Sequence, residues 1–399
     1  MNSYFQKHIS QAATLIAQYK GTEPLQHLLK KYFSANKKHG SKDRKVITHF
    51  CYTFFRIGKN LENIPMEEKL MAAIFICDGI GEKEQPNFPQ QWLPFSSGTL
   101  PERIAFIKNS YPDFRLEKIF PFSDQLSNSI DNTLFQQSFL QQPNLFLRIR
   151  PGNKNTVIKK LAMANTAFLM IDDNCLSLAN NTKIDLILKL NKEVVVQDVS
   201  SQKTGTFLEA VKTYFPENHP VSLWDACAAS GGKSILAKDI LQHIQLSVSD
   251  IRPSILKNLK QRFKEADINR YELFTADLSK PFSSTKKYEL IICDAPCTGS
   301  GTWARTPESL STFSIDKIDE FQSLQRKIIS NCIPHLQQTG YFLYITCSVF
   351  EKENEANVAF IEERFSLKCV KKESIVGYAQ NGDCMFAALF CMKNNLTLS

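Results

Sequence analysis

Apolar residues among the first 140 positions recur at the spacing of helix faces. Such stripes occupy positions 9–17, 25–32 and 46–54, where one side of each helix would face a core. Positions 79–101 are rich in proline, glycine and serine, which predicts a connector with little regular structure. We therefore expect an all-α domain over residues 1–140.

The pattern changes to short apolar runs after position 141. Residues 145–150 alternate between apolar and polar as a strand does, and a helical stripe follows them. Further strand-like runs occupy 168–171 and 186–190. This mixture predicts a small α+β module over residues 141–205.

A longer alternation of strands and helices begins near residue 221. Helical stripes separate five apolar strand runs, at 221–224, 246–249, 272–275, 290–293 and 341–345. Repeated β-α-β connections favour a doubly wound, mostly parallel sheet. The pattern thus predicts an α/β, Rossmann-like domain over residues 206–399.

The composition is that of an ordered protein with a basic N-terminal region. Of 399 residues, 43% are hydrophobic, and the formal net charge is +8. The first 60 residues hold eleven Lys and Arg against two Asp and Glu, so the excess charge is concentrated there. Such a concentration favours a phosphate-rich partner such as RNA, although a solvated helix face has the same composition.

Eleven cysteines are scattered without paired spacing, which is typical of thiols in a reducing compartment. No group of Cys or His has the spacing of a zinc site, so no metal is expected. The first residues lack the pattern of a signal peptide, and no apolar run is long enough to span a bilayer. We therefore expect a cytoplasmic, monomeric protein without a membrane partner.

Two cysteines follow predicted strands in matching contexts. Cys297 lies in Asp-Ala-Pro-Cys after the fourth strand of the sheet, and Cys347 lies in Thr-Cys-Ser after the fifth. Chemistry in an α/β sheet gathers beyond the carboxyl ends of its strands, and a thiolate is a strong nucleophile. The pair indicates a cysteine-based active site, whereas Cys227 and Cys293 are interpreted as packing residues.

A glycine-rich turn, Gly231-Gly232-Lys233-Ser234, follows the first strand of the sheet. It is not expected to bind a triphosphate, because Cys227 stands where that motif needs its first glycine. The dinucleotide-binding pattern of glycines is also absent. Glycine lets the backbone approach a ligand closely, so the turn is expected to border a smaller cofactor.

Four aspartates stand at or just after successive strand ends: Asp225, Asp250, Asp277 and Asp294. A carboxylate at the second strand end can accept hydrogen bonds from ribose hydroxyls, and one at the third can meet an adenine amino group. Each aspartate alone could instead be a helix N-cap. The series favours S-adenosylmethionine, whose sulfonium and amino groups also attract carboxylates.

Seven stretches in order carry a resemblance: Gln197-Asp-Val-Ser-Ser-Gln202, Asp225-Ala-Cys-Ala-Ala-Ser-Gly-Gly-Lys233, Ser249-Asp250-Ile, Ala276-Asp277, Asp294-Ala-Pro-Cys-Thr-Gly-Ser-Gly301, Tyr344-Ile-Thr-Cys-Ser-Val-Phe350 with Glu353-Asn-Glu355, and Asn381-Gly-Asp-Cys-Met-Phe386. Residues 141–399 thereby resemble the RNA cytosine-C5 methyltransferases, which include the bacterial 16S rRNA enzymes and the NOL1/NOP2/Sun proteins. The resemblance implies methylation of a cytosine in RNA, with small-subunit rRNA as the expected substrate and S-adenosylmethionine as the cofactor.

The resemblance also implies a covalent mechanism. Cys347 would attack C6 of the cytosine, and Asp294 would steady the base at N3. Cys297 would assist release of the adduct, and Lys233 would position the base. DNA cytosine methyltransferases use the Pro-Cys thiol instead, so the second thiol favours the RNA branch. The residues expected to bind the cofactor are Asp225, Cys227, Ala228, Ser230, Gly231, Gly232, Lys233, Asp250, Arg252, Asp277 and Asp294.

The N-terminal region resembles the NusB-like helical domain of bacterial rRNA methyltransferases in Ser41-Lys-Asp-Arg44-Lys and Cys51-Tyr-Thr-Phe-Phe-Arg56. This implies RNA binding by residues 1–140, and residues 141–205 would then be an RRM-like module. Two alternatives stay open: a tRNA cytosine-C5 methyltransferase, and a non-catalytic RNA-binding factor of ribosome assembly. The presence of both thiols, Asp294 and Lys233 argues against the second alternative.

Overall fold

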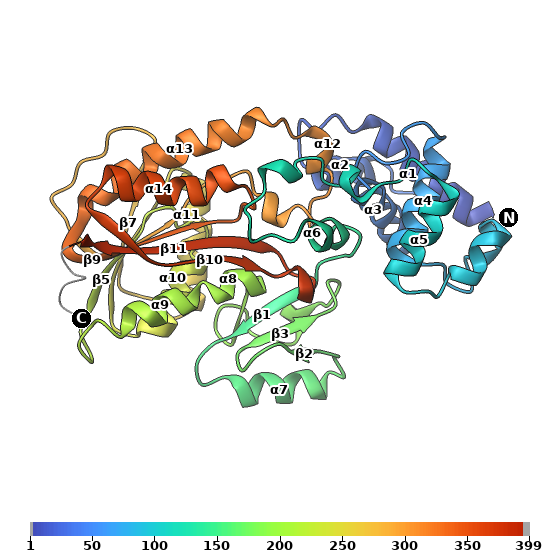
Figure 1. The fold of residues 1–399 in the computed structure, drawn as a ribbon. Coiled ribbons are helices and arrows are strands. Elements are labelled where there is room, and N and C mark those ends of the chain that lie inside the picture. Colours follow the sequence, from blue (N-terminus) through green and yellow to red (C-terminus); the bar gives the residue numbers. More distant parts are fainter. Residues whose placement is uncertain (1–2, 394–399) are drawn as a thin grey trace. The chain divides into compact units, whose positions relative to one another are not determined.

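A computed structural model describes residues 3–393, which form two compact units (Figure 1). The helical unit runs from the first helix to Asp124 and also includes Asp131–Gln142 and Trp303–Ser314. The α/β unit comprises Gln125–Ile130, Pro143–Thr302 and the described residues from Ile315 onward. The signal-peptide and domain predictions extend to residues 1–2 and 394–399, which lie outside the described part of the chain.

The helical unit contains α1 (Ser3–Gln18), α2 (Leu25–Ala35), α3 (Ser41–Arg56), α4 (Met66–Asp78), α5 (Leu100–Ser110), α6 (Asn132–Ser138) and α12 (Ser309–Thr312). Ile9 and Ala12 on α1 and Ile47 on α3 are fully buried, as their stripes predict. The predicted connector at 79–101 is more ordered than expected, because it contains the 3-10 helices η1 (Gln85–Asn87) and η2 (Gln90–Phe95). The predicted N-terminal helical region is confirmed, whereas its NusB-like character stays a prediction.

A buried arginine ties the segment Trp303–Ser314 into the helical unit. Arg56 is 2% exposed, and its Nη1 donates hydrogen bonds to the carbonyl oxygens of Phe139 (2.8 Å) and Ala304 (3.0 Å). A guanidinium is costly to bury unless its N–H groups find acceptors. These bonds therefore hold a segment from the second half of the chain against helices from the first.

The α/β unit contains a small antiparallel sheet in the order β2-β3-β1-β4. Its elements are β1 (Leu145–Ile149), α7 (Lys154–Met163), β2 (Leu169–Met170), β3 (Cys175–Leu178) and β4 (Val194–Val196). The prediction of a strand at 186–190 is wrong, because the 3-10 helix η5 (Ile184–Leu186) runs into this stretch. Burial explains the error: Ile184 and Leu188 are buried at helical spacing, whereas Leu186 is 77% exposed. The RRM-like identity of this module stays a prediction.

The large sheet has the order β10-β11-β9-β8-β5-β6-β7. Its strands are β5 (Val221–Asp225), β6 (Ile244–Asp250), β7 (Tyr271–Thr275), β8 (Tyr288–Asp294), β9 (Leu336–Thr346), β10 (Leu367–Val376) and β11 (Cys384–Met392). Strands β5 to β9 pair in parallel, and β10 and β11 add an antiparallel edge. The predicted doubly wound, mostly parallel α/β fold is confirmed.

Helices cover both faces of this sheet (Figure 1). One face packs against α9 (Gly205–Lys212), α10 (Gly232–Leu241) and α11 (Pro253–Glu265). The other packs against α13 (Asp316–Cys332) and α14 (Glu355–Arg364), and the short α8 (Val199–Lys203) precedes α9. Because the central strands are parallel, their carboxyl ends share one edge, where side chains can meet. No helix among the described residues has the length and apolarity to cross a membrane.

Candidate active site

Two thiols meet at the carboxyl edge of the large sheet. Strands β8 and β9 are parallel neighbours with Asp294 opposite Ile345, so the loops after them leave the sheet side by side. These loops place the Sγ atoms of Cys297 and Cys347 3.1 Å apart, and both cysteines are free of disulfide bonds. Two cysteines that the sequence places after separate strands are therefore in direct contact.

Cys297 is a weak acid in this site. The hydrogen bond with Cys347 and then burial raise the pKa of Cys297 well above its usual range. Cys297 therefore keeps its proton at neutral pH.

A buried carboxylate fixes both cysteine loops. Glu353 accepts hydrogen bonds from the backbone N–H of Thr298 (3.0 Å), the Thr298 hydroxyl (2.6 Å) and Gln325 Nε2 (2.8 Å). It also accepts one from the hydroxyl of Ser348. Thr298 follows Cys297 and Ser348 follows Cys347, so a single side chain holds both cysteine loops. In the sequence, Glu353 stands out only as part of a motif. Its contact with Thr298 spans 55 residues and therefore leaves no local signal.

We expect Glu353→Ala to lower the free energy of unfolding by about 2–5 kcal/mol, because the Thr298 and Gln325 N–H groups would be buried without acceptors. Urea unfolding followed by circular dichroism measures the loss. Glu351→Ala is the matched control, since Glu351 lies on the same 3-10 helix, η8 (Glu351–Glu353), with its side chain exposed. Equal stability of the two variants would contradict this role for Glu353.

A lysine and an aspartate lie beside the thiols. Lys233, in the first turn of α10, is 7% exposed, and its Nζ donates to Asp294 Oδ2 at 3.0 Å. The same Nζ donates to the Ser201 hydroxyl at 2.8 Å. Asp294 ends β8 and lines the same cavity as both thiols. The four residues expected to carry the chemistry are thus brought together around one place.

The lining of this cavity, about 510 Å³ in volume, divides the residues expected to bind a cofactor. Those that line it are Cys227, Asp250, Arg252, Asp277 and Asp294. Those that do not are Asp225, Ala228, Ser230, Gly231, Gly232 and Lys233. Lining residues that the sequence analysis missed include Ile251, Leu278, Pro296, Leu324 and Ile328. Leu324 and Ile328 lie four positions apart on α13, a spacing that could have marked a shared face.

Two of the three aspartates in the lining, Asp250 and Asp277, have different partners. Asp250, at the end of β6, accepts from the backbone N–H of Ala229 (3.0 Å) and from the backbone N–H and Nε of Arg252 (2.9 and 3.0 Å). Burial raises its pKa, but the hydrogen bonds from Arg252 outweigh burial and leave the pKa below its usual value. Asp277 accepts from the backbone and hydroxyl of Ser279, which lowers its pKa. Both side chains are therefore carboxylates at neutral pH.

Asp225 and the glycine turn support the cavity from outside its lining. Asp225 is fully buried at the end of β5 and accepts from the Ser234 hydroxyl at 2.5 Å, which ties the strand to α10. Burial raises the pKa of Asp225 to about 7. Gly231 has a φ of +83°, and a Cβ there would lie 2.5 Å from the Phe263 ring, so the turn needs glycine. Ser230 accepts from Arg262 Nη1 at 2.7 Å. Cofactor contacts by these residues stay predictions.

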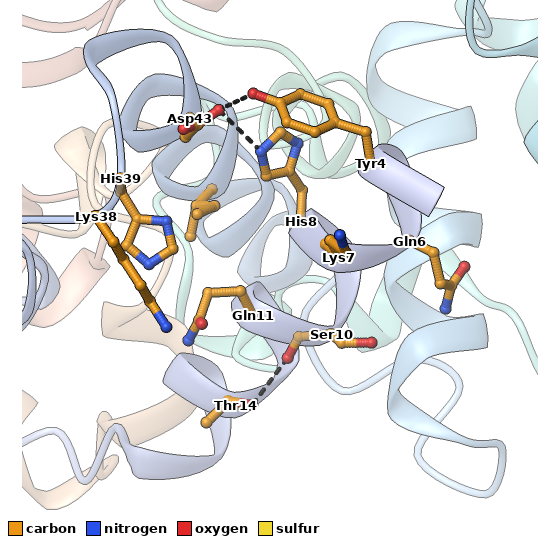
Figure 2. Close-up of a pocket in the computed structure, with 11 residues that line it drawn as sticks. Tyr4, Gln6, Lys7, His8, Ser10, Gln11, Thr14, Lys38, His39 and Asp43 are labelled. Carbon is orange, nitrogen blue, oxygen red and sulfur yellow. Dashed lines mark hydrogen bonds and ion pairs between the residues drawn. The ribbon is translucent and has the colours of Figure 1, made fainter. Parts of the chain in front are cut away.

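Figure 2 shows a second cavity, of about 640 Å³, in the helical unit. Side chains of α1 and of the start of α3 surround it, and both His8 and Tyr4 contact the Asp43 carboxylate. Lys7 and Lys38 belong to the basic N-terminal region and also line it. It contains none of the residues expected to react or to bind a cofactor.

Comparison with known proteins finds a family model and relatives that resemble part of the chain. Residues 211–388 match the model of the family described as 16S rRNA methyltransferase RsmB/F. The chain is 27% identical over 280 residues to ribosomal RNA small subunit methyltransferase B of Shewanella oneidensis, covering 68% of this chain and 61% of that protein. It is 27% identical over 260 residues to the protein of that name from an Enterobacter species, covering 63% and 57%. The match thus spans about six tenths of the length of these relatives.

Solved structures share the fold at low sequence identity. The crystal structure of PH0851 has a TM-score of 0.71 at 18% identity, covering 96% of this chain and 98% of that one. NSun6 from Pyrococcus horikoshii, solved with SFG, has a TM-score of 0.57 at 14% identity, covering 69% of this chain and 96% of that one. Family model and relatives confirm the resemblance that the seven sequence stretches indicate. Residues 211–388, somewhat less than half of the chain, are therefore similar to the RsmB/F methyltransferases, and the relatives named above support a likeness to the NOL1/NOP2/Sun family.

Proposed function

We propose that this protein uses S-adenosylmethionine to methylate C5 of a cytosine in RNA, with small-subunit rRNA as its substrate. The observation that carries the proposal is the contact between Cys297 and Cys347 at a cavity that also holds Asp294. Aromatic C5 is a poor nucleophile until C6 is saturated, so this reaction needs a thiolate and a group that later removes a proton. The names of the curated relatives and the basic N-terminal region support RNA as the substrate.

S-adenosylmethionine fits the chemistry of the cavity lining. Asp250 and Asp277 offer carboxylates to ribose hydroxyls and amino groups, and Leu278 and Ile328 offer an apolar surface to adenine. A volume of about 510 Å³ lies in the range of small-molecule sites. When bound, this cofactor supplies an electrophilic methyl group. The solved neighbour with SFG supports the same assignment, since SFG is an analogue of this cofactor.

Asp250 would hold the cofactor through carboxylate oxygens that now accept hydrogen bonds from Arg252. The Arg252 side chain is 59% exposed, so it can move aside for a ligand hydroxyl, whereas the hydrogen bond from the Ala229 N–H keeps the carboxylate in place. We expect Asp250→Ala to weaken S-adenosylmethionine binding about 10- to 100-fold, the effect of losing hydrogen bonds to a charged group. Isothermal titration calorimetry measures the affinity.

The matched control for Asp250→Ala is Asp319→Ala, which removes an exposed carboxylate paired with Lys352 outside the cavity. An Asp250→Ala protein that binds the cofactor as tightly as the Asp319→Ala protein would exclude the proposed contact.

In the proposed reaction, the Cys347 thiolate forms a bond to C6 of the cytosine. The electron pair of the C5–C6 double bond moves toward N3, where Asp294 delivers or shares a proton while the Lys233 ammonium compensates its charge. C5 then has enamine character and can accept the methyl group. The adduct at this stage joins Cys347 to RNA and still carries the C5 proton.

Release requires removal of that proton. Once Cys347 has become a thioether, its hydrogen bond no longer raises the pKa of Cys297, so Cys297 can pass its own proton to water. The Cys297 thiolate would then accept the C5 proton, the C5–C6 double bond would re-form, and the bond between Cys347 and C6 would break. One thiol attacks and the other releases, which explains why two are needed.

The test is transfer of labelled methyl groups to protein-free small-subunit rRNA, with tRNA in a parallel reaction and nucleoside mass spectrometry of the product. Label in 5-methylcytosine of rRNA supports the proposal. Label only in tRNA would favour the tRNA enzyme. Cofactor binding without transfer to either RNA would indicate that the substrate is an assembled ribosomal particle. Absence of cofactor binding would favour the non-catalytic factor.

A further inference from the structure

A chain of hydrogen bonds runs from the small sheet to the proposed reaction site. Arg148 Nε, on β1, donates to Gln197 Oε1 at 2.9 Å, and Gln197 Nε2 donates to Ser201 Oγ at 3.1 Å. Lys233 Nζ donates to the same Ser201 Oγ at 2.8 Å and to Asp294 Oδ2 at 3.0 Å. Gln197 and Ser201 lie in the first stretch of the family resemblance, to which the proposed chemistry assigns no role.

The two cationic members of this chain, Arg148 and Lys233, can only donate hydrogen bonds. A guanidinium can only donate, so Arg148 fixes which end of the Gln197 amide accepts, and the amide must then donate to Ser201. An ammonium also only donates, so the Ser201 oxygen accepts from both Gln197 and Lys233. The chain therefore specifies the orientation of every group up to Asp294.

Burial gives the chain its rigidity. Arg148 is 6% exposed, and Gln197 and Lys233 are each 7% exposed. Hydrogen bonds shielded from water in this way are stronger than exposed ones, and a buried donor without an acceptor is costly. Arg148 is itself anchored, because its Nη1 donates to Asp239 Oδ2 of α10 at 2.6 Å. The helix α10 carries both Asp239 and Lys233, so it takes part in both ends of this series of hydrogen bonds.

We propose that Ser201 and Gln197 are positioning residues, which hold the Lys233 ammonium against Asp294 for the reaction at the base. The inference rests on the proposed function and deepens it: the small sheet, through Arg148, becomes part of the catalytic machinery. Without the Ser201 hydroxyl, Lys233 keeps a single oxygen partner in this chain and its flexible stem can shift. Misplacing a charge by about 1 Å at a reaction centre costs about 100-fold in rate.

We expect Ser201→Ala to lower kcat for methyl transfer about 10- to 100-fold while KM for RNA and for the cofactor stay within about twofold of wild type. Ser201→Thr keeps the hydroxyl and should recover most of the rate. Ser200→Ala is the matched control, because its buried hydroxyl in the same helix donates to Asp198 and lies outside the chain. It should match wild type in kcat.

A second measurement separates this inference from the proposed reaction. Competitive acetylation by acetic anhydride, read by mass spectrometry across pH, reports the reactivity of Lys233 without any methyl transfer. Ser201→Ala should raise that reactivity several-fold, and Ser201→Thr and Ser200→Ala should not. If Ser201→Ala raised the reactivity of Lys233 but the wild-type protein methylated no RNA, the positioning role would stand and the proposed reaction would be wrong. Unchanged Lys233 reactivity in Ser201→Ala, or a kcat loss equal to that of Ser200→Ala, would overturn the inference.

Discussion

Cys347→Ala is expected to reduce methyl transfer by at least about 10⁴-fold, the usual cost of deleting a covalent nucleophile. The Cys297 thiol is 3.1 Å away, but the Asp-Ala-Pro-Cys loop presents it from a different strand, so it cannot simply take over the attack on C6. Cofactor affinity and melting temperature should stay close to wild type, because the change removes one sulfur at a partly exposed site. Single-turnover kinetics with labelled cofactor measure the rate.

The control for this prediction is Cys369→Ala, which removes another half-buried cysteine of the α/β unit, on β10 and outside the cavity. It should methylate RNA at the wild-type rate. If Cys347→Ala kept more than about a tenth of the activity while Cys297→Ala lost it, the nucleophile would be the Pro-Cys thiol, as in the DNA enzymes.

The central sheet could be predicted from sequence because its signals are local. Each of the strands β5, β6, β8 and β9 is an apolar run with an acidic or reactive residue at or just beyond its carboxyl end. Parallel pairing then requires those ends to share one edge, whatever the loops do. That constraint is why two thiols 50 residues apart could be assigned to one site, whereas their 3.1 Å contact also depends on Glu353, which holds both loops.

Features that depend on long-range contacts could not be predicted in the same way. Ser201 reaches Lys233 across 32 residues, and no periodicity marks a hydroxyl as the partner of an ammonium. The segment Trp303–Ser314 follows a cysteine loop of the α/β unit in sequence, yet Arg56 holds it in the helical unit. Strands as short as β4 (Val194–Val196) carry too few residues for alternation to show.

Cys297→Ala is expected to trap a covalent complex between the protein and RNA while lowering turnover at least about 100-fold, the usual contribution of a general base. Attack by Cys347 needs no group from Cys297, so the bond to C6 still forms and the methyl group is still accepted. Only removal of the C5 proton is blocked, and the bond to Cys347 cannot break without it. A slower-migrating protein band on a denaturing gel, lost after ribonuclease digestion, would identify the complex.

The double variant Cys297→Ala/Cys347→Ala decides whether the trapped complex has the proposed linkage. If Cys347 forms the bond, the double variant should give no covalent band, although its cofactor affinity stays near wild type. If a band persisted, another nucleophile would be attacking the base. If Cys297→Ala turned over normally with no band, the C5 proton would leave to some other group, and the contact between the two thiols would serve only to keep Cys347 reactive. The raised pKa of Cys297 argues against that last outcome, because the conjugate base of a weakly acidic thiol is a strong acceptor for the C5 proton.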